Sequence, residues 1–127
     1  MAEYVDTNTK SLEADAAIAL HARVVFEADG KVVTAGITDK EIGTAEQEAF
    51  AAGDIITVRL RTAAGSCKMI AVEALSVGDA VYTAASGKVA DTAASTSYLV
   101  GQALTISAAD GDIVEVVRNS HGDTAVA

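Results

Sequence analysis

The chain carries the same short phrases twice in the same order, and this internal duplication constrains its fold more than any other feature. "AAGDIITVRLR" at Ala51–Arg61 and "AADGDIVEVVRN" at Ala108–Asn119 both place Gly-Asp after small residues and before a run rich in Val and Ile. Matched glycines lie 57 residues apart in the first of the following pairs and 58 apart in the next two: Gly30 and Gly87, Gly43 and Gly101, Gly53 and Gly111. A spacing that drifts by one residue indicates a duplication with one inserted residue in a loop.

Each copy is typical of β-hairpins. Asp29-Gly30 separates two alternating runs, and Ser86-Gly87 does the same in the second copy. Because glycine accepts a positive φ, we expect Gly30 and Gly87 to form the hairpin turns of the scaffold. The sequence therefore predicts a single β-domain over residues 20–119, with repeat halves at about 20–62 and 67–119.

Two segments have sequence features that favour a helix. Thr44–Gly53 has a capping box and good helix formers, but its partner in the second copy contains Thr105 and Ile106 and favours a strand. We expect a strand there, with at most one helical turn before Gly53. Ser11–Leu20 has the signature of a short helix. We expect residues 1–19 to form an N-terminal arm outside the repeat and residues 120–127 to form a flexible tail.

Composition favours a thin all-β core. Half of the 127 residues are hydrophobic, but many are alanine, and aromatic residues make up only 4% with no Trp. Alanine buries little apolar area, so such a core contributes little stability by itself. We expect a small β-barrel or sandwich built from two related halves, with an extended N-terminal arm, one short helix at most, and stability gained from neighbouring molecules.

The charge and the single cysteine exclude several classes of protein. A net charge of −9 argues against partners such as nucleic acid and anionic membranes. Cys67 alone cannot form an intrachain disulfide, and no apolar run approaches the roughly 18 residues that cross a bilayer. We expect a soluble protein made in a reducing cytoplasm.

Residue types that carry chemistry occur without the spacing that chemistry needs. His21 and His121 are the only histidines, and no metal-ligand or phosphate-loop motif is present. Ser66 and Cys67 lie beside Lys68, but no nucleophile elbow surrounds them, so we interpret Cys67 as a small hydrophobic residue entering a strand. We expect no catalytic residues, no cofactor and no metal.

Four aspartates recur next to glycine, which raises the possibility of calcium. These residues are Asp29, Asp54, Asp79 and Asp112. Each offers one carboxylate, and no EF-hand spacing is present. We expect them to stabilise turns by bonding nearby backbone amides.

Four phrases carry a resemblance to a known family. "AAIALHARVVF", "IGTAEQEAFAAGDIITVRLR", "LSVGDAVYTAASGKV" and "LVGQALTISAADGDIVEVV" are similar in order and spacing to the capsid decoration proteins of tailed phages, also called cement proteins. The likeness covers about Met1–Asn119. The chain departs from typical members in having neither Pro nor Trp.

This resemblance implies a structural protein on the exterior of a virion, made in the cytoplasm of a bacterial host. It would bind the major capsid protein on the expanded head and stabilise the shell by clamping neighbouring capsomers, as a homo-oligomer for which a trimer is favoured over a dimer. Tyr4 is an aromatic residue on a polar arm, so Glu3, Tyr4 and Val5 are the expected capsid contacts.

Two alternatives remain open. A carbohydrate- or ligand-binding β-module of a larger assembly would need exposed aromatic residues on one face, and this chain has few. A small hydrolase would use Ser66 or Cys67 as its nucleophile.

Overall fold

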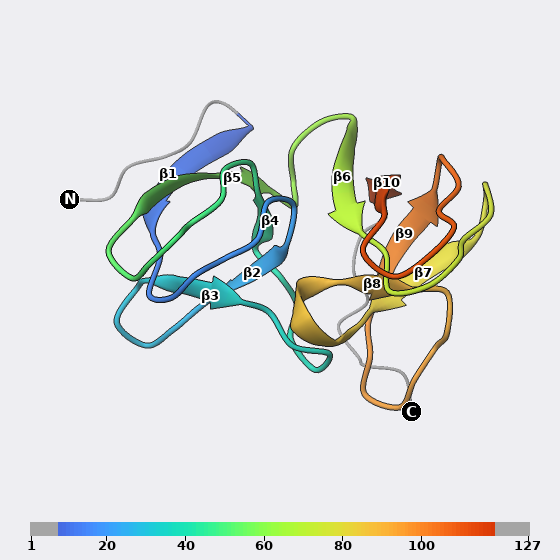
Figure 1. The fold of residues 1–127 in the computed structure, drawn as a ribbon, viewed down its shortest axis with the longest axis horizontal. Helices are drawn as coiled ribbons and strands as arrows, with labels where there is room; N and C mark the ends of the chain where they lie inside the picture. Colours follow the sequence, from blue (N-terminus) through green and yellow to red (C-terminus); the bar gives the residue numbers. More distant parts are fainter. Residues whose placement is uncertain (1–7, 119–127) are drawn as a thin grey trace.

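A computed structural model describes residues 8–118, and these form an all-β protein with two similar halves side by side (Figure 1). The N-terminal half is a five-stranded antiparallel sheet in the order β1-β5-β4-β2-β3. Its strands are β1 (Thr9–Glu13), β2 (Arg23–Phe26), β3 (Val32–Thr34), β4 (Gly43–Ala45) and β5 (Ile55–Leu60).

The C-terminal half repeats this architecture strand for strand. Its sheet has the order β6-β10-β9-β7-β8, which is the order of the first half shifted by five strands. The elements are β6 (Ser66–Ile70), β7 (Ala80–Thr83), the 3₁₀ turn η1 (Ala85–Gly87), β8 (Val89–Ala90), β9 (Leu99–Ala103) and β10 (Ile113–Arg118). The identical strand order confirms the predicted duplication.

The register also repeats, and it locates the inserted residue. Val24 pairs with Gly43 in the first half, and Val81 pairs with Gly101 in the second. Beyond that point Tyr82 pairs with Leu99, so Val100 is one residue too many on its strand. A β-bulge absorbs such an extra residue and accounts for the change in repeat spacing from 57 to 58. The insertion thus lies in β9 and not in a loop, where the spacing alone predicted it.

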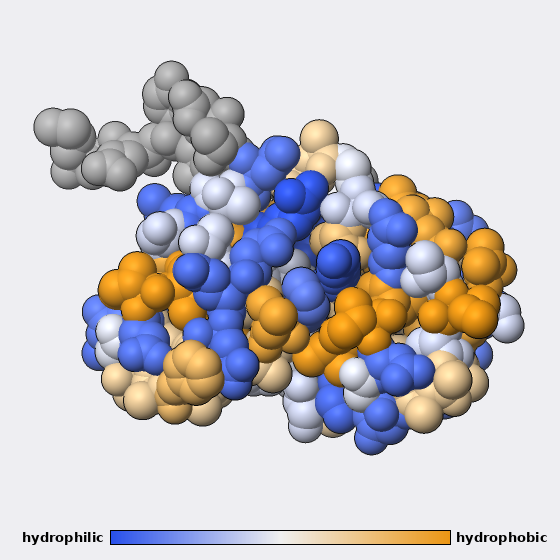
Figure 2. Space-filling model, turned by 45° about the horizontal axis from the view of Figure 1, so that its top comes forward, coloured by the Kyte–Doolittle hydropathy of each residue, from blue (hydrophilic) through white to orange (hydrophobic). Residues whose placement is uncertain are grey.

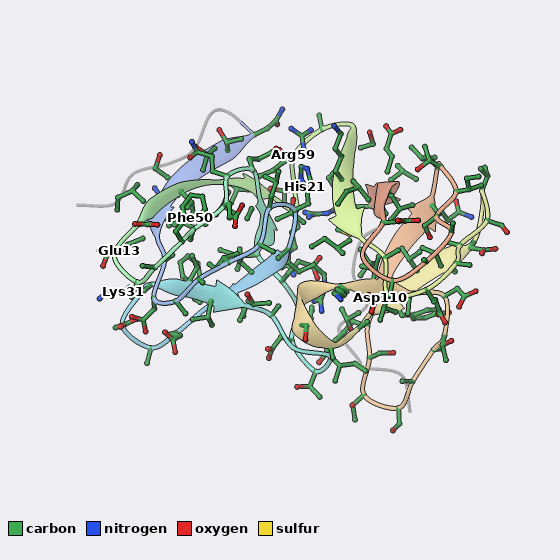
Figure 3. All side chains as sticks on the ribbon, viewed as in Figure 1. Glu13, His21, Lys31, Phe50, Arg59 and Asp110 are labelled. Atoms are coloured by element: carbon green, nitrogen blue, oxygen red, sulfur yellow. The ribbon has the colours of Figure 1, made fainter. Side chains whose placement is uncertain are left out.

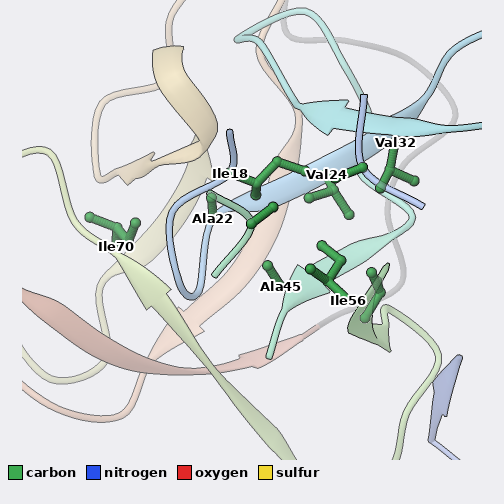
Figure 4. Close-up of a cluster of buried hydrophobic side chains, with 10 residues drawn as sticks. Ile18, Ala22, Val24, Val32, Ala45, Ile56 and Ile70 are labelled. Carbon is green, nitrogen blue, oxygen red and sulfur yellow. The ribbon is translucent and has the colours of Figure 1, made fainter. Parts of the chain in front are cut away.

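Neither sheet closes into a barrel. In each half a single bridge joins the chain just beyond the first strand to the third strand, Ala14 to Val32 and Ala71 to Val89. These matched bridges curl each sheet around its own cluster of small and branched aliphatic side chains. Figure 4 shows the N-terminal cluster, in which Ile18, Val24 and Ile56 are fully buried and Ile70 enters from the other half.

Arg23 on β2 joins the two halves. Its guanidinium is fully buried and pairs with Glu41 Oε1 at 3.3 Å. It also donates to carbonyl oxygens of the C-terminal half, at 2.6 Å to Ala84 and 3.0 Å to Lys88. A buried guanidinium needs such a complete set of acceptors, so the turn around η1 is held against β2.

The hairpin turns are as predicted. Gly30 has a φ of +85° between β2 and β3, and Gly87 has a φ of +73° between β7 and β8. Gly87 has a second role, because a Cβ there would lie 2.7 Å from the Thr34 side chain and 3.1 Å from Ala22. This close approach lets the second hairpin pack against the first half.

Two expectations about the N-terminal segment need correction. Residues 1–19 are not all an arm, because β1 pairs with β5 and is the repeat mate of β6, so the duplicated unit begins near Thr9 rather than residue 20. The short helix expected over Ser11–Leu20 is wrong, since β1 and a bend occupy that segment. The strand favoured for Thr44–Gly53 is short, because β4 ends at Ala45 and bends, a bridge at Ala49 and a turn follow without a helical turn.

The expected tail at residues 120–127 lies outside the described residues. Within residues 8–118, no helix is long and apolar enough to cross a membrane.

Candidate functional site

The expected capsid contacts Glu3, Tyr4 and Val5 lie outside the described residues, and so does His121. Among the residues that the structure describes, three features are candidates for function. They are a cleft between the halves, a group of carboxylates beside the first hairpin, and exposed apolar side chains.

The cleft has a volume of about 460 Å³ and is lined from both halves. His21 and Arg59 lie at the edge of the N-terminal half that faces β6 (Figure 3). The lining side chains are His21, Glu46 and Arg59 from the first half, and Ser66, Cys67, Lys68, Thr105, Ile113 and Glu115 from the second.

His21 occupies an unusual backbone position. Its φ is +70°, and its repeat mate is Gly78 with a φ of +90°. Partial burial lowers the pKa of the imidazole, which Glu46 opposes and Lys68 reinforces. The side chain therefore favours the neutral form at pH 7.

Among the described residues, neither candidate nucleophile is hydrogen-bonded to a histidine. The Ser66 hydroxyl donates to Glu115 Oε2, not to a histidine. Cys67 is buried in β6, where burial raises the pKa of its thiol despite the nearby charge of Arg118. Its S–H donates to the Val116 carbonyl oxygen at 3.7 Å. The thiol is thus held protonated, the unreactive form.

The aspartates beside glycine stabilise turns, as predicted. Asp54 Oδ2 accepts from the amides of Phe50 and Ala51, and in the second half Asp112 Oδ2 accepts from Ala108 and Ala109. In two further turns, Asp79 accepts from the Ser76 amide and Asp29 from the Lys31 amide.

Asp29 also belongs to a group that the sequence analysis missed. Carboxylate oxygens of Asp15, Glu27 and Asp29 lie within 4.8 Å of one another. A hydrogen bond with the Asp15 carboxyl raises the pKa of Glu27. Lys31 faces the group, with its Nζ 3.9 Å from Asp15 and 3.2 Å from Glu13. These side chains are largely exposed, and Lys31 offsets part of their charge.

Each half has four exposed large apolar side chains, and those of the N-terminal half are Leu20, Phe26, Phe50 and Ile55. We call those of the C-terminal half the C-terminal apolar patch: Val77, Leu104, Ile106 and Ile113. Leu20 and Ile55 are the repeat mates of Val77 and Ile113, so the C-terminal half differs mainly at Leu104 and Ile106. In Figure 2 hydrophobic residues cover more of the C-terminal half, at the right, than of the N-terminal half. The most exposed apolar side chain of the N-terminal half is Phe50, at 78%.

No protein-family model matches this chain, and no curated protein matches it either.

Proposed function

We propose that this protein is a structural decoration protein of a tailed-phage head. It binds the major capsid protein on the exterior of the expanded shell and stabilises the shell by clamping neighbouring capsomers, without catalysis. The arm residues Glu3, Tyr4 and Val5 contribute to attachment in this proposal, and a trimer on the shell stays a prediction.

The observation that carries the proposal is the duplicated unit itself. One five-stranded unit occurs twice, joined through Arg23, and each copy has a small core made largely of Ala and Val. Such a unit gains stability when an assembly covers more of its apolar surface. Many copies side by side on a shell also bind by multivalency, so each contact can be weak.

The alternatives have less support. A hydrolase that used Cys67 would need an accessible thiolate, but the Cys67 thiol is buried, and the hydroxyl of Ser66 is not hydrogen-bonded to a histidine among residues 8–118. A carbohydrate-binding module would need a platform of aromatic rings, whereas Phe26 and Phe50 are the only strongly exposed aromatic side chains among residues 8–118.

The test uses expanded heads stripped of bound copies. Added protein should sediment with the heads and raise the temperature at which they rupture. A variant lacking residues 1–7 keeps β1 intact, so it should fold normally but attach more weakly if the arm contributes. Protein that stays in the supernatant, or that binds without changing head stability, would contradict the proposal. Binding to a glycan array instead would favour the carbohydrate alternative.

A further inference from the structure

We propose that the C-terminal apolar patch is the docking surface of the molecule and that it takes a protein surface with an apolar centre and a rim of Lys and Arg. This inference rests on the proposed function, where the shell supplies that surface. It adds which half of the chain faces the partner and the chemistry that the partner must present.

The duplication provides an internal control for the patch. Leu104 and Ile106 are repeat mates of Glu46 and Glu48, and all four side chains are exposed. The backbone is the same in both halves, because Glu46 N–H donates to Thr57 O at 2.8 Å and Leu104 N–H donates to Glu115 O at 2.7 Å.

The residue between each pair also has the same role. Gln47 Oε1 accepts from the Thr57 amide, and Thr105 Oγ1 accepts from the Glu115 amide. The fold therefore accommodates glutamate on either side of this position. Leucine and isoleucine are not needed there for folding, and 71% of Ile106 stays in contact with water. Exposed apolar side chains without a folding role indicate an interaction surface.

Hydrogen bonds bring the members of the patch together. Leu75 pairs with Ser107, and Gly78 N–H donates to Ala103 O at 2.8 Å, so the loop carrying Val77 runs antiparallel to residues 103–107. On the other side the bond from Leu104 to Glu115 places the segment beside β10, where Ile113 is 45% exposed. The four patch residues therefore lie on neighbouring segments, two loops and one strand, and Ile113 also lines the cleft.

Charge defines the partner. The segments that form the patch, residues 73–79 and 102–115, carry five acids and neither Lys nor Arg: Glu73, Asp79, Asp110, Asp112 and Glu115. Lys68 lies beside them, across from Glu115 on β6 and at the cleft, so acids outnumber bases around the patch. Of these acids, Asp110 is paired with a lysine, Lys88, at 2.8 Å. A second copy packed patch against patch would bring like charges together in a chain of net charge −9. A partner with a basic rim is complementary, and its association rate should fall as salt rises.

The test gives two positions of the C-terminal half the residues found at the matching positions of the N-terminal half. The variant L104E/I106E has glutamate at both positions, as the first half has at Glu46 and Glu48. It should therefore fold like the wild type. Phe50→Ser is the matched control, because it removes a still more exposed apolar side chain from the other half. Two probes are used: stripped expanded heads, and a synthetic amphipathic helix with one leucine face bordered by lysines.

The patch predicts that L104E/I106E loses at least about 30-fold in affinity for both probes while F50S binds like the wild type. If the wild type binds only the peptide, and L104E/I106E does not, the docking surface stands and the decoration function is wrong. If L104E/I106E binds heads like the wild type, the docking surface is wrong and the function stands. Binding to neither probe, or a dimer in sedimentation equilibrium that L104E/I106E dissociates, would overturn the inference.

Discussion

At the scale of single residues, Arg23 explains why the two halves remain together. The guanidinium bonds carbonyl oxygens of both halves and the Glu41 carboxylate in full burial. Its repeat mate is Ala80, which is exposed and has no side-chain hydrogen-bond donor. The first half therefore supplies the side chain that joins the two halves, and the second half has no equivalent side chain at that position.

Glu41→Gln should lower the free energy of unfolding by about 3–5 kcal/mol, because it removes the one carboxylate that is hydrogen-bonded to the buried Arg23 guanidinium. Chemical denaturation monitored by circular dichroism measures this change. Asp110→Asn is the control, since its ion pair with Lys88 is mostly exposed and its loss should cost no more than about 1 kcal/mol. Equal effects of the two substitutions would show that Arg23 is not the joint.

The residue scale is also where sequence reasoning failed most. The turn aspartates could be predicted because their bonds are local. The carboxylate group could not, because Asp15 is far from Asp29 in sequence and meets it only after β3 folds back. The apolar patch had a readable signal, since a position-by-position comparison of the repeats sets Leu104 against Glu46, but Thr105 and Ile106 were interpreted only as strand residues.

At the scale of elements, β4 and β9 each contain a glycine that lies too close to the neighbouring strand for any side chain. These are Gly43, beside β5, and Gly101, beside β10. A Cβ on Gly43 would lie 2.2 Å from the Arg59 carbonyl oxygen, and one on Gly101 would lie 2.0 Å from the Val117 carbonyl oxygen. Neither obstacle can move without breaking the ladder with β5 or β10. The duplication preserved this steric requirement in both sheets.

Gly43→Ala and Gly101→Ala should each lower the free energy of unfolding by more than about 4 kcal/mol. Complete loss of the folded state would also agree with this prediction. Gly53→Ala and Gly111→Ala are the matched controls, because both have a φ of +96° but open space around the new Cβ. They should cost about 1–2 kcal/mol, the usual strain of a left-handed residue. Thermal unfolding of the four variants gives the comparison, and similar melting temperatures would refute the steric argument.

Strand alternation and turn glycines predicted most elements, including both hairpins and the last strand of each half. The first strand was missed because β1 is short and polar, with the sequence TKSLE, and its burial comes from pairing with β5. Its mate β6 is more apolar and was recognisable. A duplicated element can thus be hidden in one copy while it is readable in the other.

At the scale of the whole molecule, acidic surface charge sets how stability depends on pH. A hydrogen bond with Asp15 raises the pKa of Glu27, and one with Asp91 raises that of Glu73. A carboxyl whose pKa is higher in the folded state contributes stability that is complete below its unfolded value of 4.5 and is lost as pH rises through the folded value.

The variant E27Q/E73Q should therefore be more stable than the wild type at pH 7, and this advantage should disappear as pH falls below 4.5. Both proteins keep His21, whose lowered pKa destabilises each equally as pH falls through 6.5, so the difference between them isolates the two glutamates. Denaturation across this pH range measures it. An advantage that grows toward low pH would have the wrong sign for the account.

The duplication has produced two halves with one fold and different surfaces, and the account holds that the C-terminal half faces the partner. A three-dimensional reconstruction of stripped expanded heads incubated with the protein tests this most directly. The account predicts two-lobed density on the outer surface, with the lobe that carries Leu104 and Ile106 against the shell. A reconstruction with bare shells, or with the Glu46 and Glu48 edge against the capsid, would contradict it.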